Sequence, residues 1–234
     1  MIALSESYYE LREEDLKEYK SCQFDWNCEN CSKNLCINLV AVAELPSLYG
    51  NFKILGFANN KDQKDHIAVV KGDVSGQEVV LTRLHSSCLT GDALGSMRCD
   101  CGPQLHTTLD IMEKEGLAVL LYMQQEGRGI GLVNKIKAYQ LQDAGFDTYD
   151  ANIHLGFEPD ERDYEVSAAM LRKLGVKSVR LLTNNPDKIK QLRAYGVEIT
   201  ERVPLELPTH EQDRVYMETK KERFGHNLTL ESNE

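Results

Sequence analysis

Three cysteines lie close together in the polar, glycine-containing stretch "CLTGDALGSMRCDCG". These residues, Cys88, Cys99 and Cys101, follow the spacing C-x10-C-x-C. A catalytic zinc ion takes three protein ligands and keeps a fourth position for water, whereas a structural zinc ion takes four protein ligands. The trio would therefore suit hydrolysis by a zinc-activated water, and His85 or His106 could add a fourth ligand. The spacing alone also fits three small buried side chains without a metal.

Three further stretches contain groups that bind anions. The glycines of "QQEGRGIG" would let backbone N–H groups approach an anion, although a simple turn explains them equally well. In "LLTNNPDK" a strand runs into a helix that starts at Pro186, so Lys188 and free N–H groups could bind an anion, or Asn185 could simply cap the helix. "EPDERDYE" brings Asp160 and Arg162 together, either as a general base and a phosphate-binding cation or as a solvated loop.

The elements that must hold these residues alternate between strand and helix. Strand patterns occur in "INLVAVAEL", "GNFKILGFA", "LAVLLYM" and "VKSVRLLT", and "HIAVVKGDVSGQEVVLTRLH" predicts two strands around a turn at residues 72–76. Helices are predicted in "PQLHTTLDIMEKEG", "LVNKIKAYQLQDAG", "DYEVSAAMLRKLG" and "NNPDKIKQLRAYG". In the first helix Leu105, Leu109 and Met112 share one face. The alternation predicts an α/β layer fold, in which functional residues gather at strand ends.

The composition is that of an acidic, soluble protein. The 234 residues are 41% hydrophobic and 27% charged, with a formal net charge of -10, which argues against bulk nucleic acid as a partner. No apolar run approaches the roughly 20 residues that span a bilayer, so a membrane is not expected as a partner either. The N-terminus is too acidic for a signal peptide, so we expect a cytoplasmic protein. Disulfides are rare in that reducing compartment, so we expect the seven cysteines to act in metal binding or catalysis.

The chain divides into three parts by pattern. Residues 1–40 form an N-terminal extension, residues 41–225 a single catalytic domain, and residues 226–234 a C-terminal tail. The extension holds a second cysteine cluster with the spacing C-x5-C-x2-C-x4-C, formed by Cys22, Cys28, Cys31 and Cys36. This cluster could hold a second, structural zinc ion or an iron–sulfur cluster, could act as redox-sensitive thiols, or could have no such role.

Four stretches in a fixed order resemble the GTP cyclohydrolase II family, whose reaction opens riboflavin biosynthesis. They read "RLHSSCLTGDALGSMRCDCGPQL", "YMQQEGRGIGLVNKIKAYQLQD", "DTYDANIHLGFEPDERDY" and "LLTNNPDKIKQL", and the likeness covers roughly residues 65–205. The resemblance implies a three-layer α/β/α fold with a mixed sheet, and a homodimer. It also implies GTP as the substrate, Mg²⁺ beside the triphosphate, and one catalytic Zn²⁺ per chain held by Cys88, Cys99 and Cys101.

The family removes C8 of guanine as formate, releases pyrophosphate and leaves a diaminopyrimidinone ribosylamine 5'-phosphate. By resemblance the zinc-activated water attacks C8, and Tyr139 matches the active-site tyrosine that assists loss of formate. Asp160 matches a proposed proton acceptor, and Arg162 matches a residue proposed to attack the α-phosphate. Because a guanidinium stays protonated, we expect Arg162 to stabilise charge at the phosphate instead.

The resemblance also implies a set of substrate contacts. They are Arg83, Leu84, His85, Ser86, Ser87, Gln104, Glu126, Gly127, Arg128, Thr148, Thr183 and Lys188. This chain has Ser87 where the family frequently has glutamate, and a hydroxyl would make a weaker contact with the guanine edge than a carboxylate. Two alternatives follow: a relative that stops at the formamido intermediate or uses another purine nucleotide, and a nucleotide-binding protein without turnover.

Overall fold

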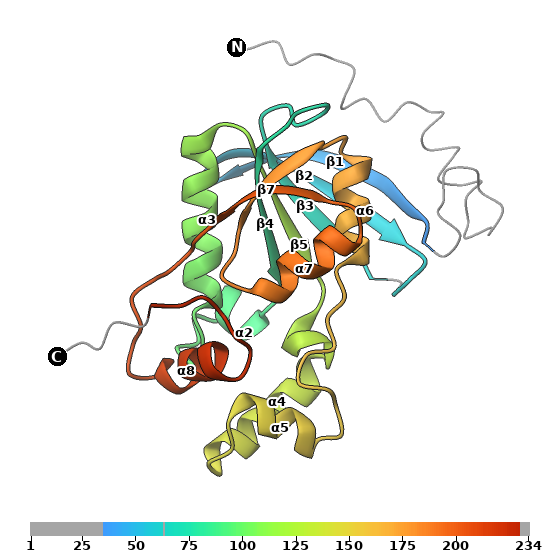
Figure 1. The fold of residues 1–234 in the computed structure, drawn as a ribbon. Helices are drawn as coiled ribbons and strands as arrows, with labels where there is room; N and C mark the ends of the chain where they lie inside the picture. The colour runs from blue at the N-terminus through green and yellow to red at the C-terminus, as the bar shows by residue number, and fades with distance from the viewer. Residues whose placement is uncertain (1–34, 63, 230–234) are drawn as a thin grey trace.

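A mixed seven-stranded sheet forms the centre of the molecule, in a computed structural model that describes residues 35–62 and 64–229 (Figure 1). The spatial order is β1-β2-β3-β5-β4-β6-β7. Strands β1, β2, β3 and β5 pair antiparallel, and β5, β4, β6 and β7 pair parallel. The strands are β1 (Ile37–Ser47), β2 (Gly50–Asn59), β3 (His66–Lys71), β4 (Val80–Ser86), β5 (Ala118–Met123), β6 (Ser178–Leu182) and β7 (Glu198–Val203).

Helices cover both faces of this sheet. The long helix α3 lies against one face, and α6 and α7 lie against the other, which gives the three-layer α/β/α arrangement expected from the sequence (Figure 1). The helices are α2 (Leu89–Asp92), α3 (Cys101–Glu115), α4 (Leu132–Asp143), α5 (Thr148–His154), α6 (Glu165–Lys173), α7 (Pro186–Ala194) and α8 (Arg214–Glu222). None of the helices in the described part of the chain is long and apolar enough to cross a lipid bilayer.

Two apolar clusters hold the layers together. Successive side chains of β5 point to opposite faces, so Val119 and Leu121 pack towards α6, while Leu120 packs towards α3. Leu105 and Met112 of α3 belong to the second cluster, as their shared helical face predicts. The buried run of β4 and β5 is typical of central strands covered on both faces.

The two strands predicted around residues 72–76 are present, but they are not neighbours. Strand β5 lies between β3 and β4, antiparallel to the first and parallel to the second. The chain therefore crosses from β4 through α3 to β5, and the glycine turn is a loop between strands that do not pair with each other. Strand pairing depends on which faces become covered, and no local pattern in the chain records that.

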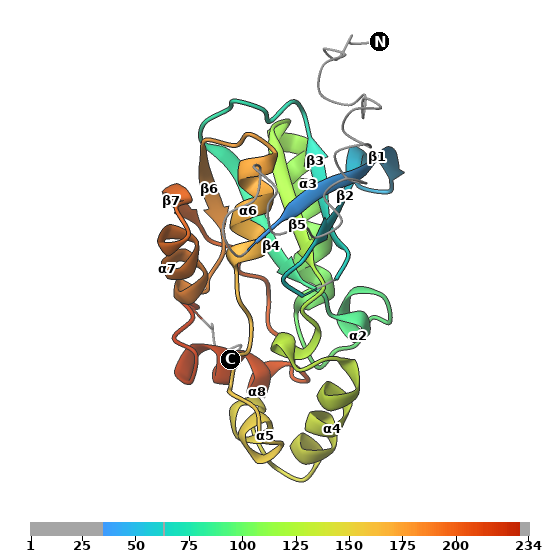
Figure 2. The ribbon, with the colours of Figure 1, turned by 90° about the vertical axis from the view of Figure 1, so that its right-hand side faces the viewer.

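The parallel strands place the functional stretches at one edge. Strands β4, β5 and β6 all end there, and the chain continues from them into α2, α4 and α7. Below this edge lie α4, α5 and α8, the last two of which were not predicted (Figure 2). Ligands bind at the carboxyl ends of strands in open α/β sheets, so this edge is where a site is expected.

Candidate active site

A cavity with an empty volume of about 1140 Å³, part of it open to solvent, lies at this edge. Most of the residues that the sequence predicted for the site line it. They are Arg83, His85, Ser86, Ser87, Cys88, Cys99, Cys101, Gln104, Glu126, Gly127, Arg128, Tyr139, Thr148, Arg162, Thr183 and Lys188. Segments far apart in the sequence therefore meet in one place.

Two predicted site residues, Leu84 and Asp160, are not among the residues that line the cavity. The Leu84 side chain is buried in the core, and its carbonyl oxygen accepts a hydrogen bond from Lys188 Nζ at 2.8 Å. Asp160 accepts a hydrogen bond from Arg162 Nε at 2.7 Å and a second one from Arg162 Nη2. Both residues therefore support a neighbouring cation, and Asp160 as a proton acceptor stays a prediction from the resemblance.

The three cysteines converge from two connected elements. Cys88 follows β4 as the N-cap of α2, and Cys101 is the first residue of α3. Their sulfurs and that of Cys99 all lie within 4.8 Å of one another, and Cys88 Sγ is 3.7 Å from Cys99 Sγ. Gly91 packs against them so closely that an added Cβ would lie 3.0 Å from Cys99 Sγ. A side chain at this position would therefore crowd the sulfurs of the trio where the α2 backbone passes them.

The electrostatics of the trio suit a divalent cation. Hydrogen bonds from Cys101, Cys99 and Lys135 lower the pKa of Cys88. A hydrogen bond with Cys101 favours ionisation of Cys99, but its contact with Cys88 and burial prevail and raise its pKa to about 11. Hydrogen bonds to the same two sulfurs, and burial, raise the pKa of Cys101 well above its usual value. The unmetallated trio thus carries one thiolate, and a bound cation would stabilise three.

The donor set fits zinc, because three sulfur ligands within one small site favour a soft, tetrahedral ion. In the part of the chain that the structure describes, no histidine joins this group as a fourth ligand. His85 Nε2 lies 3.0 Å from Asp92 Oδ1, and His106 stacks on the Tyr49 ring. A site with three protein ligands leaves a position for water or substrate, which is the catalytic rather than the structural arrangement.

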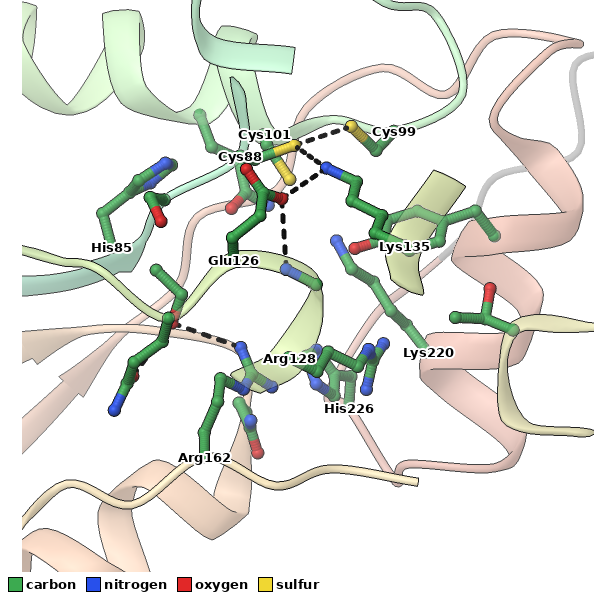
Figure 3. A pocket seen from close by; sticks show the side chains of 18 of the residues that line it. His85, Cys88, Cys99, Cys101, Glu126, Arg128, Lys135, Arg162, Lys220 and His226 are labelled. Carbon is green, nitrogen blue, oxygen red and sulfur yellow. Dashed lines mark hydrogen bonds and ion pairs between the residues drawn. The ribbon is translucent and has the colours of Figure 1, made fainter. Parts of the chain in front are cut away.

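A lysine that the sequence analysis did not single out lies beside the trio. Lys135 Nζ is 3.0 Å from Cys88 Sγ and 2.7 Å from Glu126 Oε1 (Figure 3). Glu126 Oε2 in turn accepts a hydrogen bond from the backbone N–H of Leu89 at 2.7 Å. The signal in the sequence is the spacing of Lys135 and Tyr139, which are four residues apart and so share one face of α4.

Tyr139 lies on the same side of the cavity as the trio. Its hydroxyl is 3.1 Å from Thr90 Oγ1, in the helix that Cys88 caps. The Arg98 guanidinium carbon lies 4.9 Å from the centroid of its ring. Burial raises the pKa of Tyr139, so the phenol keeps its proton and can donate a hydrogen bond.

The opposite side of the cavity is cationic. Arg128 and Arg162 reach into it from the loops after β5 and before α6 (Figure 3). Lys188 of α7 also lines the cavity. Burial, followed by the nearby charges of Arg83 and Arg162, lowers the pKa of Lys188 well below its usual value. Buried nitrogens of Arg83 (Nε) and Arg128 (Nη1) have no hydrogen-bond partner in the described part of the chain. This side of the cavity is therefore built to receive an anion.

The helix start at Asn185 is explained by ordinary capping. The Asn185 side chain accepts a hydrogen bond from the Asp187 N–H at 2.9 Å, and Pro186 is the first helical residue. Thr183 Oγ1 accepts the Asn185 N–H at 3.1 Å. The contribution of this stretch to anion binding is consequently the Lys188 amino group, which a bound anion would hold protonated, more than free N–H groups.

Several residues lining the cavity were missed by the sequence analysis. They are Arg98, Gln125, Ile130, Lys135, Ala138, Gln142, Asn152, Asn184, Asn185, Tyr216, Lys220, His226 and Leu228. From sequence alone, a polar loop residue that lines a cavity cannot be told from one exposed to solvent. His226 was missed because the sequence analysis placed it in a C-terminal tail. Of the second cysteine cluster, Cys22, Cys28 and Cys31 lie outside the described residues, whereas Cys36 is buried and disulfide-bonded. A sulfur in a disulfide is not available to a metal ion.

This chain is similar to known proteins both in sequence and in structure. The riboflavin biosynthesis protein RibBA of Bacillus mycoides (strain KBAB4) is 57% identical over 186 residues, which make up 80% of this chain and 47% of that protein. RibBA of Bacillus cytotoxicus is 56% identical over the same length. The chain thus spans about half the length of the curated relatives it matches. RibBX, a two domain 3,4-dihydroxy-2-butanone 4-phosphate synthase from A. baumannii, matches over 80% of this chain and 43% of that chain, at 18% identity and a TM-score of 0.41, too low to carry an argument.

The family profile described as GTP cyclohydrolase II matches residues 38–204. This range includes the cysteine trio, Tyr139, Arg162 and Lys188, and it spans the sheet from β1 to β7. Together with the identity to the RibBA proteins, the match shows that the chain belongs to the GTP cyclohydrolase II family.

Proposed function

We propose that this chain is a zinc-dependent hydrolase that opens the imidazole ring of GTP, releasing formate and pyrophosphate, as the first step of riboflavin biosynthesis. The observation that carries the proposal is one cavity with the Cys88, Cys99 and Cys101 trio on one side and an anion-binding group of cations on the other. A purine nucleotide has a ring to be attacked and a phosphate chain to be held, and this cavity offers chemistry for both.

The trio would hold the zinc ion, which supplies a Lewis acid that makes a water molecule nucleophilic near neutral pH. Tyr139 lies beside the trio with a protonated hydroxyl, so it can donate a hydrogen bond to the formamide that ring opening produces. Ser87 Oγ is buried and has no hydrogen-bond partner in the described part of the chain, so it is free to contact the base.

The cations would bind and orient the phosphates. Asp160 fixes the Arg162 guanidinium through two hydrogen bonds. Burial opposes the charge, but the nearby Tyr164 and Asp160, with the hydrogen bonds to Asp160, raise the Arg162 pKa. Arg162 therefore remains charged, and stabilises developing charge at the α-phosphate instead of attacking it. Mg²⁺ beside the triphosphate and a homodimeric assembly are further expectations from the family resemblance.

The test is incubation of the zinc-loaded protein with GTP and Mg²⁺, followed by separate measurement of formate, pyrophosphate and purine absorbance. Equal amounts of formate and pyrophosphate, with loss of the purine absorbance, support the proposal. A product that keeps the formyl group supports a partial reaction instead. Unchanged GTP would refute the proposal and favour a nucleotide-binding protein without turnover. Inosine triphosphate as a second substrate measures the selectivity for guanine.

A further inference from the structure

The segment that follows β7 returns to the cavity and completes its wall. The family profile ends at residue 204, yet Tyr216, Lys220 and His226 line the cavity. Helix α8 lies below the sheet, and it contacts α5 (Figure 1). The segment Asp213–Leu228 is therefore part of the site although it lies outside the matched range.

Two basic residues, Lys220 and Arg223, join this segment through ion pairs to elements on either side of the cavity. Lys220 Nζ hydrogen bonds to Asp100 Oδ1, in the loop between Cys99 and Cys101. Arg223 donates to Asp147 at 3.1 Å and to Asp150 at 3.0 Å, at the start of α5. The first pair is buried and the second is exposed, so the first contributes more to holding the segment in place.

The segment also positions a predicted substrate contact. The Arg128 guanidinium carbon lies 3.7 Å from the centroid of the Phe224 ring, as a stacked cation–π pair. Arg128 Nη1 is buried, has no hydrogen-bond partner among the described residues, and lies 3.7 Å from Asp160 Oδ2. The ring therefore holds the guanidinium while leaving nitrogen donors free for a ligand.

The side chain of His226 lines the cavity, but no hydrogen bond from the described residues accounts for its position there. Its backbone N–H donates to the Lys220 carbonyl at 3.0 Å, but no group in the described part of the chain hydrogen bonds to its ring. Four cations face it: Lys220 from α8, Arg128 from the loop after β5, Lys188 from α7 and Arg162 from the loop before α6. Burial and these charges lower the pKa of His226 to about 2, so the ring is neutral and retains one N–H donor.

The His226 ring has no carboxylate hydrogen bonded to it in the described part of the chain, although Lys220 and Arg162 beside it pair with Asp100 and Asp160. The only carboxylate among the residues lining the cavity is Glu126, and it is engaged by Lys135 on the other side. His226 is half-buried and lines the cavity, so its ring N–H is accessible to a ligand bound there. An anion with several oxygen acceptors would satisfy the His226 N–H and the free Arg128 donor together.

We propose that His226 is a binding residue for the phosphate chain of the nucleotide, presented by the segment Asp213–Leu228, which also fixes Arg128 through Phe224. The assignment of the anion to a nucleotide rests on the proposed function, whereas the anion site itself rests on the geometry. A phosphate oxygen bound here would accept from the imidazole N–H next to the donors of Arg128.

The test is isothermal titration of the full-length, zinc-loaded protein with inorganic tripolyphosphate, without Mg²⁺. We expect His226→Ala to weaken binding about tenfold, because a hydrogen bond to a charged acceptor is lost. His226→Asn keeps an N–H donor and should recover part of the affinity. Phe224→Leu should weaken binding by releasing Arg128. His210→Ala is the matched control, since His210 is exposed, precedes the segment Asp213–Leu228 and does not line the cavity.

Tripolyphosphate affinity of His226→Ala and His226→Asn within twofold of the wild type, with zinc content and circular dichroism unchanged, would overturn the proposal. If His226→Ala does not fold, the Asn and Leu variants decide the question. The assay does not involve turnover, so it is independent of the reaction. If the wild-type protein consumes no GTP, but only these variants bind tripolyphosphate more weakly, the anion site is supported and the proposed reaction is refuted.

Discussion

Lys135 Nζ lies 3.0 Å from Cys88 Sγ and 2.7 Å from Glu126 Oε1, so one ammonium joins a sulfur of the cysteine trio to the loop after β5. Three thiolates and one Zn²⁺ would carry a net charge of -1, and Glu126 adds a second negative charge nearby. Lys135 offsets part of this charge in a site shielded from water. Its pKa is raised: burial opposes the charge, but the hydrogen bonds to Cys88 and Glu126 outweigh that cost.

Lys135→Met is expected to weaken zinc binding by roughly tenfold or more, because a group that supports a metal ligand is removed and Glu126 loses its partner. Competition with a chromophoric chelator measures the affinity without reference to turnover. Lys137→Met is the control, since Lys137 is an exposed lysine on the same helix. Equal zinc affinity in both variants would show that Lys135 does not support the metal site.

Cys99→Ser is expected to lose zinc and ring-opening activity together, because two thiolates make a poor tetrahedral site. Zinc content by elemental mass spectrometry and formate release should fall in parallel. In the wild-type protein, a chelator should abolish activity and added zinc should restore it. Normal turnover by the zinc-free protein would remove the assigned role of the trio.

Tyr139→Phe is expected to slow formate release about a hundredfold while slowing GTP consumption much less, because the hydroxyl acts after the ring has opened. A formamido product should accumulate and can be followed by mass spectrometry. Tyr49→Phe serves as the control, since Tyr49 packs on His106 away from the cavity. Equal slowing of both steps would contradict this role for the Tyr139 hydroxyl.

His66 is expected to make the fold sensitive to acid. It is fully buried; its Nδ1 accepts the Gln124 N–H at 3.1 Å, and Nε2 lies 3.1 Å from Asp62 Oδ2. Burial lowers the His66 pKa even though Asp62 opposes the shift. The unfolded chain, with a pKa of about 6.5, then binds a proton that the native state does not, so stability falls as pH drops below about 6.5.

Urea unfolding at pH 7.5 and at pH 5.5 measures this contribution. His66→Asn, whose amide can still accept the Gln124 N–H, should lose less stability between the two pH values than the wild type, by up to about 1 kcal/mol. The comparison between proteins is needed because burial also lowers the pKa values of His85 and His226, which act in the same direction. Identical pH dependence in both proteins would exclude His66 as the cause.

Much of the local structure could be predicted from the sequence because it depends on neighbours along the chain. The shared face of Leu105, Leu109 and Met112 follows from helical periodicity, and Asn185 with Pro186 marks a helix start by its own chemistry. The spacing of Cys88, Cys99 and Cys101 likewise predicted that three sulfurs lie close together, because Cys99 and Cys101 are held near each other by the chain itself. These features survive in the structure at the same positions.

Only the tertiary structure decided which distant groups share the cavity. Strand β5 lies between β3 and β4, which brings the loop with Glu126 beside Cys88 and so gives Lys135 its two partners. His226 reaches the same cavity through α8, although its position in the sequence resembles a tail. Lysine and histidine are usually found on the surface, so their identity alone does not show that they are buried in a site. Their burial depends on long-range contacts that no local sequence pattern encodes.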